Sequence, residues 1–249
     1  IAVVPGGAYP SYTHGYYARD NAFYLAWDDI ARDRTRFTDW MLKSDYWKDS
    51  LAEYGIHAGV GKGVIVLADS PPATLDDRDL KNVVKSVVAM LPEPTNANSV
   101  ISFIVPVNTT STMQGGGGCV DYGGYHSQTR TVAGGSTSIA YMVNVQCTEG
   151  SKTVFDLLTE VISHEAAEAA TDPFPFSSPG WTNQTVLVGG EIGDLCVGLI
   201  TDYQVSFNDA DAGASDEKYV VQRQYSQKVA VAGKSDPCVP APASPYFNV

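Results

Sequence analysis

The stretch from Thr153 to Thr171, TVFDLLTEVISHEAAEAAT, is the strongest helical pattern in the chain, and Asp172-Pro173 follows it as a stop signal. Apolar residues recur in it at intervals of three and four and form one stripe, namely Val154, Leu157, Leu158, Val161 and Ile162. Continuing that stripe leads to His164, Glu165 and Glu168. Because a buried carboxylate without a partner is costly, we expect a bound cation or a tight hydrogen-bond network on this face.

The spacing of these polar residues is that of a metal-binding helix. His164 and Glu168 are four residues apart and therefore lie one above the other on a helix, as two ligands of one ion do. The string His164-Glu165-Ala166-Ala167-Glu168 resembles the zincin motif HExxH with its second histidine replaced by glutamate. The resemblance implies that His164 and Glu168 bind zinc and that Glu165 is the general base that activates zinc-bound water. The carboxylate in place of imidazole makes the metal a weaker Lewis acid.

A third ligand is expected from the segment that follows the helix. Glu191, within Gly189–Cys196 (GGEIGDLC), stands at a separation similar to that of the distal glutamate in thermolysin-like zincins. That resemblance implies Glu191 as the third ligand. If this segment is helical, Asp194 lies one turn later, where it would accept a hydrogen bond from the other ring nitrogen of His164. Three other residues remain alternatives for the third ligand: Asp172, Asp194 and His126.

His126 lies in the glycine-rich stretch 110–135, which we expect to be a long irregular loop pinned by Cys119. Loops of this length are commonly functional, so His126 is a candidate to polarise a substrate carbonyl. The glycines match neither a P-loop nor the GxGxxG pattern, and no Gly-x-Ser-x-Gly motif occurs in the chain. The sequence therefore favours metal chemistry over phosphate binding or a serine nucleophile.

The remaining periodicities predict an α/β (α+β) domain with a mixed sheet. Gly63–Asp69 and Ser99–Val107 have the pattern of strands, and Leu75–Leu91 between them that of an amphipathic helix. If the two strands are parallel, a right-handed crossover through this helix connects them. Ile139–Gln146 is predicted to be a further strand.

We expect one domain over residues 1–249, with the sheet and most helices in 1–150 and the metal helix and a loop-rich part in 151–249. From about Asp20 to Met41 aromatic residues recur at a helical period, and Asp45–Tyr54 continues in short helical steps that Gly55 ends. Beyond Pro175 we expect loops with short strands around 185–188 and 218–224, and long loops stapled by disulfides.

Composition limits the partners and the compartment. The chain has 249 residues, 44% of them hydrophobic, and a formal net charge of -12, which repels nucleic acid and anionic membrane. Its apolar runs are shorter than the roughly 20 residues that span a bilayer, so we expect no membrane insertion. We expect a monomer that acts on a peptide or protein substrate, and a secretion signal removed before Ile1.

The four cysteines predict disulfides and hence secretion. Cys119, Cys147, Cys196 and Cys238 are widely spaced and form no CxxC pair. They allow three pairings, of which the sequential one closes the shortest loops.

The order of several segments resembles the exordium/phosphate-induced family of plant extracellular proteins and its bacterial relatives. The matching pieces, which cover most of residues 40 to 200, are Asp45-Tyr46-Trp47 to Gly55, the helix after Leu75, Ser102–Val105, Cys119 with Gly124-Tyr125-His126, and Ala169–Pro173. The resemblance implies an extracellular or cell-wall protein with no settled enzymatic role.

Two hypotheses of function follow. The first is a secreted zinc metallopeptidase in which strand 139–146 aligns a peptide beside the metal helix. The alternative is a non-catalytic extracellular or cell-wall binding or signalling protein in which the same residues hold a structural metal ion. A calcium-stabilised lectin is disfavoured by the histidine, because calcium prefers oxygen ligands.

Overall fold

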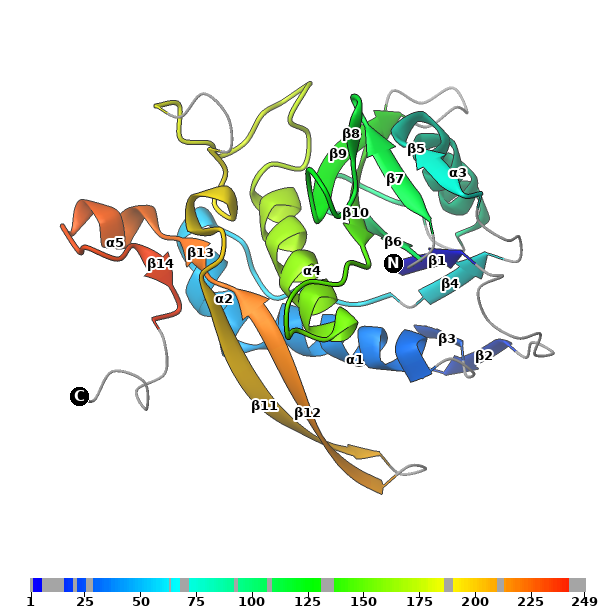
Figure 1. Cartoon of the computed structure of the whole chain (residues 1–249), viewed down its shortest axis with the longest axis horizontal. Helices are drawn as coiled ribbons and strands as arrows, with labels where there is room; N and C mark the ends of the chain where they lie inside the picture. Colours follow the sequence, from blue (N-terminus) through cyan, green and yellow to red (C-terminus); the bar gives the residue numbers. More distant parts are fainter. Residues whose placement is uncertain are drawn as a thin grey trace.

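The computed structural model has mixed α/β content, as predicted (Figure 1). It describes residues 2–5, 16–19, 22–25, 29–62, 64–67, 72–91, 94–106, 109–130, 137–185, 190–209 and 213–241.

The central element of the fold is a five-stranded sheet with the order β4-β1-β6-β10-β9. Its strands are β1 (Ala2–Pro5), β4 (Val64–Leu67), β6 (Val100–Val105), β9 (Gly124–Arg130) and β10 (Ser138–Val145). Four of them are parallel, and β9 runs antiparallel to β10 at one edge. The predicted strand-helix-strand unit is present as β4, α3 (Asp77–Met90) and β6, but β1 lies between its two strands.

The edge position of β9 corrects two expectations. We expected 110–135 to be irregular, but it contains β7 (Thr110–Met113), β8 (Gly116–Gly117) and β9, and β7 also pairs with β5 (Thr74–Asp76). We expected strand 139–146 to align a peptide, but β10 has a neighbour on each side and no free edge. Within the described residues β9 pairs with β10 alone, so β9 offers the free edge.

The N-terminal helical region is shorter than its aromatic pattern predicts. The pattern begins near Asp20, but within it Ala22–Leu25 forms strand β3, which pairs with β2 (Tyr16–Arg19), and α1 (Asp29–Lys43) begins later. After α1 come α2 (Asp45–Leu51) and a short 3-10 helix (Ala52–Tyr54), which Gly55 ends with a left-handed φ of 77° as predicted. The aromatic side chains that are described here, including Phe37 and Trp47, pack into the core.

The C-terminal part is more regular than we expected. Instead of short strands in a loop-rich region, β11 (Ile200–Asp209) and β12 (Gly213–Gln222) form one long hairpin. The predicted strand at 218–224 is mainly the second half of β12, while most of the strand predicted at 185–188 lies outside the described residues. The chain continues through β13 (Gln224–Tyr225), α5 (Gln227–Val231) and β14 (Cys238–Val239).

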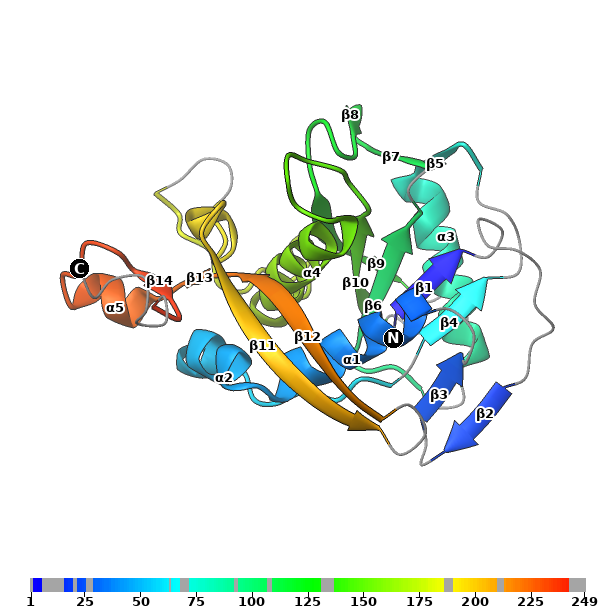
Figure 2. The same ribbon diagram turned by 60° about the horizontal axis from the view of Figure 1, so that its bottom comes forward.

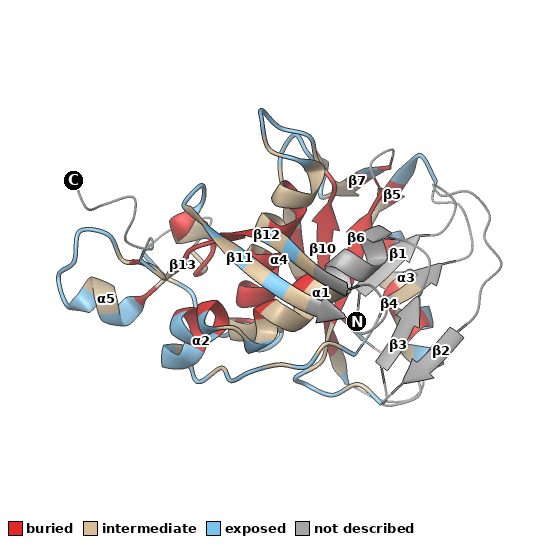
Figure 3. Ribbon diagram, turned by 90° about the horizontal axis from the view of Figure 1, so that it is seen from below, coloured by how far each residue is buried: buried red, intermediate tan, exposed pale blue. Residues whose placement is uncertain are grey.

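The predicted metal helix is α4 (Val154–Thr171), which lies at the centre of the molecule (Figure 2). One side of α4 packs on β9 and β10, and another packs on β12 of the long hairpin. Buried residues are concentrated in α4, β10 and the neighbouring strands (Figure 3). Leu157, Leu158 and Ile162 of the apolar stripe are buried as predicted.

Two disulfides, Cys119–Cys147 and Cys196–Cys238, confirm the sequential pairing. The second joins a 3-10 turn (η2, Asp194–Cys196) to β14. Among the helices of the described ranges, none is both long and apolar enough to cross a membrane.

The start of α4 provides a test of its stability. Thr153 accepts a hydrogen bond from the Asp156 amide at 3.0 Å, and Asp156 accepts one from the Thr153 amide at 3.2 Å. Because Thr153→Ala removes one half of this capping box, we expect the free energy of unfolding in urea to fall by about 1 kcal/mol. Ser86→Ala, at an exposed position within α3, serves as the control and should leave it nearly unchanged. Equal stability of the two variants would show that the cap contributes nothing.

Candidate metal centre

The inward face of α4 carries the acidic residues, as the stripe predicted. Glu165 and Glu168 are each only 3% exposed, although both are charged residues in their ordinary state. His164 precedes them on the same side of the helix, and its side chain is 15% exposed. Such deep burial of two carboxylates requires compensating positive charge or donors nearby.

One group of side chains gathers around Nε2 of His164. Glu168 Oε1 lies 3.2 Å from this nitrogen and Asp194 Oδ1 lies 3.7 Å from it. The backbone amide of Asp194 also donates to Glu168 Oε1 at 3.1 Å, which fixes the carboxylate relative to the turn that carries Asp194. His164, Glu168 and Asp194 thus present three ligand atoms to one point.

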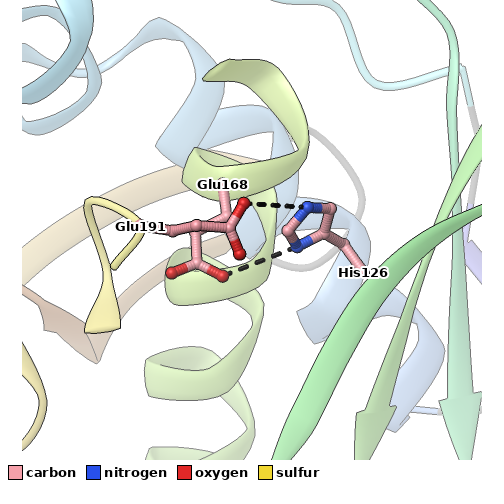
Figure 4. Close-up of side chains that lie close together, drawn as sticks. All are labelled: His126, Glu168 and Glu191. Atoms are coloured by element: carbon pink, nitrogen blue, oxygen red, sulfur yellow. Dashed lines mark ion pairs between the residues drawn. The ribbon is translucent and has the colours of Figure 1, made fainter. Parts of the chain in front are cut away.

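A second group is formed at Glu168 by His126 of strand β9 and Glu191 of the 190–196 segment (Figure 4). Nδ1 of His126 lies 3.5 Å from Glu168 Oε2, and Nε2 of the same ring lies 3.4 Å from Glu191 Oε1. Nδ1 is also 3.7 Å from Glu165 Oε2. The His126 ring therefore points into the carboxylates, which favours a role within the cluster over contact with a substrate carbonyl.

The segment that carries Glu191 and Asp194 is held in place at several points. Ile192 is fully buried in the core, and its carbonyl accepts a hydrogen bond from the Tyr225 amide at 2.8 Å. Cys196, two residues after Asp194, is tied to β14 by its disulfide. These anchors place both carboxylates over the inward face of α4.

Gln222, at the end of β12, determines which nitrogen of His164 is free. Its Nε2 donates to the Gly193 carbonyl at 2.7 Å, so its Oε1 is the atom that faces His164 Nδ1 at 3.0 Å. Because an amide oxygen only accepts, Nδ1 carries a proton, and in the neutral ring Nε2 is the nitrogen whose lone pair points toward Glu168 and Asp194. We had expected Asp194 to accept from this ring nitrogen, but Gln222 occupies that place.

The geometry and the chemistry of these groups fit a divalent cation. Two ligands of a tetrahedral zinc stand roughly 3.3 Å apart when each bond is about 2.0–2.1 Å long, close to the separations between His164 and Glu168 and between His126 and Glu191. Three buried atoms here have no hydrogen-bond partner: His126 Nε2, Glu165 Oε2 and Glu191 Oε1. Imidazole with carboxylates suits zinc, whereas calcium prefers oxygen ligands alone.

Two glycines make room for the cluster. A Cβ atom at Gly193 would lie 2.8 Å from both Glu168 Oε1 and His164 Nδ1. A Cβ atom at Gly124 would lie 2.8 Å from Glu165 Oε1 and 2.6 Å from the Val161 side chain. Glycine at both positions therefore lets α4, β9 and the 190–196 segment approach one another.

The pKa values of the two histidines show how strongly the carboxylates favour a positive charge beside them. Burial opposes a charge on His126, but Glu165, Glu168 and Glu191 outweigh it and raise the pKa of His126 to about 12. Burial likewise opposes a charge on His164, but Glu165 and Glu168 raise its pKa to about 10. A bound cation would supply the charge that protons otherwise bring.

The carboxylates respond differently to this environment. Burial raises the pKa values of Glu165, Glu191 and Asp194. Burial acts in the same direction on Glu168, but contacts with His126 and His164 outweigh it and lower the pKa of Glu168 to about 2. Glu168, between the two imidazoles, is therefore the carboxylate that stays ionised most firmly.

The sequence-predicted residues thus divide between the two groups. Asp194 lies with His164 and Glu168, whereas Glu191 lies with His126 and Glu168. Asp172, the remaining alternative, is buried at the end of α4 and accepts a hydrogen bond from the Gly180 amide at 2.8 Å. Sequence reasoning missed Gln222, because nothing local marks a strand glutamine as the partner of a distant histidine.

Comparison with known proteins adds little to this geometry. No family model matches the chain, and no solved structure matches it. One of the subunits of a 3-oxoadipate CoA-transferase from Pseudomonas knackmussii is 71% identical over 41 residues, which are 16% of this chain and 14% of that protein. The similarity covers too little of either chain to show a shared family.

Removing the Gln222 amide tests the assigned tautomer of His164. In Gln222→Leu, Nδ1 loses its acceptor, so we expect zinc affinity to fall by about 10- to 100-fold, as for other residues that orient a ligating histidine. Competition titration against a chromophoric chelator measures the change. Gln146→Leu, which removes a buried glutamine that donates to the Val105 carbonyl instead, is the matched control. If both variants bind zinc equally well, Gln222 does not orient His164.

A methyl group at Gly193 tests the close approach directly. Gly193 has φ -74° and ψ -47°, which alanine adopts readily, so only the added Cβ atom is at issue in Gly193→Ala. We expect this atom to displace His164 or Glu168 and to weaken zinc binding at least about tenfold, because the ligands must keep their geometry. Gly117→Ala, whose Cβ atom would meet nothing within 4 Å, should bind zinc like the wild type. Unchanged affinity in Gly193→Ala would contradict the described packing.

Proposed function

We propose that the protein is a secreted zinc-dependent hydrolase of the metallopeptidase type, with Glu165 as its general base. The observation that carries the proposal is the position of Glu165. Its Oε1 lies 3.9 Å from His164 Nε2, and its Oε2 is buried without a hydrogen-bond partner. A buried carboxylate that lies beside the metal ligands and keeps one oxygen free of hydrogen bonds suits a proton acceptor.

The proposal gives each of these residues a role. His164, Glu168 and Asp194 would hold the zinc, which when bound supplies a Lewis acid that polarises a carbonyl and lowers the pKa of a water molecule. Glu165 takes the proton from the attacking water and returns it to the leaving amine. Burial raises the pKa of Glu165, which brings this carboxylate closer to the range of an effective base.

Access to the cluster supports the proposal as well. The side chains of Asp194 and Glu191 are 28% and 23% exposed, against 4% for Glu165, so the cluster opens toward solvent on the side of the 190–196 segment. A catalytic zinc needs such an open side, whereas a structural zinc is enclosed by four protein ligands.

Strand β9 supplies a place for an extended substrate beside the cluster. The His126 side chain is 4% exposed, yet the residue as a whole is only half-buried, so its exposed surface belongs to the main chain. Free backbone groups at a sheet edge pair with extended peptides by strand addition. We therefore assign β9, rather than β10, to substrate alignment.

Secretion is part of the proposal because the two disulfides persist in oxidising compartments. The zincin and exordium-family resemblances of the sequence are consistent with an extracellular protein. They concern short segments, so the site geometry remains the stronger support.

The alternative is a non-catalytic extracellular binding or signalling protein with a structural metal ion. The burial of Glu165 and Glu168, each 3% exposed, favours it, since structural ions are enclosed. On this alternative Glu165 has no proton to transfer. The variant Glu165→Gln would then behave like the wild type, and neither would cleave a peptide.

The variant Glu165→Gln separates the two. We expect it to keep its zinc but to lose about 10²- to 10⁴-fold in cleavage rate, because the amide cannot accept the proton. The measurement is cleavage of a complex peptide mixture by the zinc-loaded protein, followed by mass spectrometry, with zinc content determined in parallel. Glu160→Gln makes the same chemical change on the same helix, at a residue paired with Lys152, and should leave the rate unchanged. A wild type that cleaves no peptide, or a fully active Glu165→Gln, would refute the hydrolase.

A further inference from the structure

The cluster holds more ligand groups than a single cation uses. Two sets of three ligating residues are present, and they have Glu168 in common. Oε1 of that carboxylate lies 3.2 Å from His164 Nε2, and Oε2 lies 3.5 Å from the nearer nitrogen of the His126 ring, whose other nitrogen, Nε2, faces Glu191. One ligand atom from each of His126, Glu168 and Glu191 lies within 4.8 Å of the other two. A carboxylate placed in this way is suited to bridge two ions.

We propose that the centre is dinuclear, with Glu168 bridging two divalent cations, one held with His164 and Asp194 and the other with His126 and Glu191. The first of these is the zinc of the proposed function, on which this inference rests. The second is a site that the hydrolase mechanism described above does not require.

The second set has the features of a built cation site. His126 Nε2 and Glu191 Oε1 are both buried and have no hydrogen-bond partner, although they lie only 3.4 Å apart. The His126 side chain is 96% buried, since 4% of it is exposed, and it points into the carboxylates. An imidazole nitrogen and a carboxylate oxygen that make no hydrogen bond, yet stand at the separation of two zinc ligands, are explained by an ion between them.

The number of charged groups in the cluster also favours two ions. Glu165, Glu168, Glu191 and Asp194 bring four negative charges together, and within the described residues their ion-pair partners are His126 and His164, with no lysine or arginine among them. With both imidazoles neutral as ligands, one divalent cation leaves two negative charges uncompensated in a largely buried cluster. Two divalent cations compensate all four, which removes the cost of burying unpaired charge.

A second ion would also explain why His126 points into the cluster. In two-metal hydrolytic sites the ions jointly stabilise the attacking and leaving oxygens. His126 then acts as a ligand from the edge strand, which places the second cation between the first one and the strand assigned to the substrate.

Counting the bound metal tests the proposal independently of activity. Protein stripped with a chelator, reloaded with zinc and passed through gel filtration is analysed for metal per chain. We expect two equivalents in the wild type and in Glu160→Gln, one in Glu191→Gln, and none in Glu168→Gln, which loses the shared ligand. Glu191 is partly exposed, so its neutral isostere is the variant most certain to fold, and thermal unfolding of each protein confirms that it does.

Several outcomes would overturn the proposal. One equivalent in the wild type, two in Glu191→Gln, or one retained in Glu168→Gln would each contradict a Glu168-bridged pair. These results are distinguishable from failure of the proposed function. A single zinc together with peptide cleavage that depends on Glu165 leaves the hydrolase intact, whereas two zinc ions without any cleavage leave the dinuclear centre intact.

Discussion

The structure depends on compensating the negative charge buried on the inner face of α4. Glu165 and Glu168 are each 3% exposed in the middle of a helix that packs on the sheet and on the β11–β12 hairpin. The free energy needed to bury two unpaired carboxylates exceeds what the burial of the apolar stripe of one helix contributes. The surrounding elements must therefore supply positive charge. The two imidazoles that reach these carboxylates do so either as protonated partners or as ligands of a cation.

Three separate parts of the chain converge on this face, and one of them adds further carboxylates to those of α4. Strand β9 brings His126, the anchored segment 190–196 brings Glu191 and Asp194, and the end of β12 brings Gln222 against His164. The orienting contact of Gln222, the room left by glycine at 124 and 193, and the Cys196–Cys238 disulfide all restrain the same few side chains. This much restraint around titratable groups is characteristic of a preorganised site.

The parts of the fold that were predictable from sequence are those with strong local signals. The α4 helix, its inward acidic face, the turn at Gly55 and the sequential disulfides follow from periodicity, conformational preference and loop length. The position of β9 was missed because its alternation of buried Tyr125, Ser127 and Thr129 lies in a glycine-rich, mostly polar stretch. The long hairpin was missed although Tyr203, Val205 and Phe207 alternate along β11 and pack against the core. The pairing of His164 with Gln222, 58 residues away, is a tertiary contact without any local signature.

The central claim is that the inner face of α4 binds a divalent cation. Crystals of protein purified without chelators, measured on both sides of the zinc absorption edge, test this most directly, because anomalous scattering both identifies and locates the metal. Our account predicts an anomalous peak within bonding distance of His164 Nε2 and Glu168. Crystals without any such peak, in which the imidazoles pair directly with the carboxylates, from a protein whose Tm does not change in strong chelator, would contradict it.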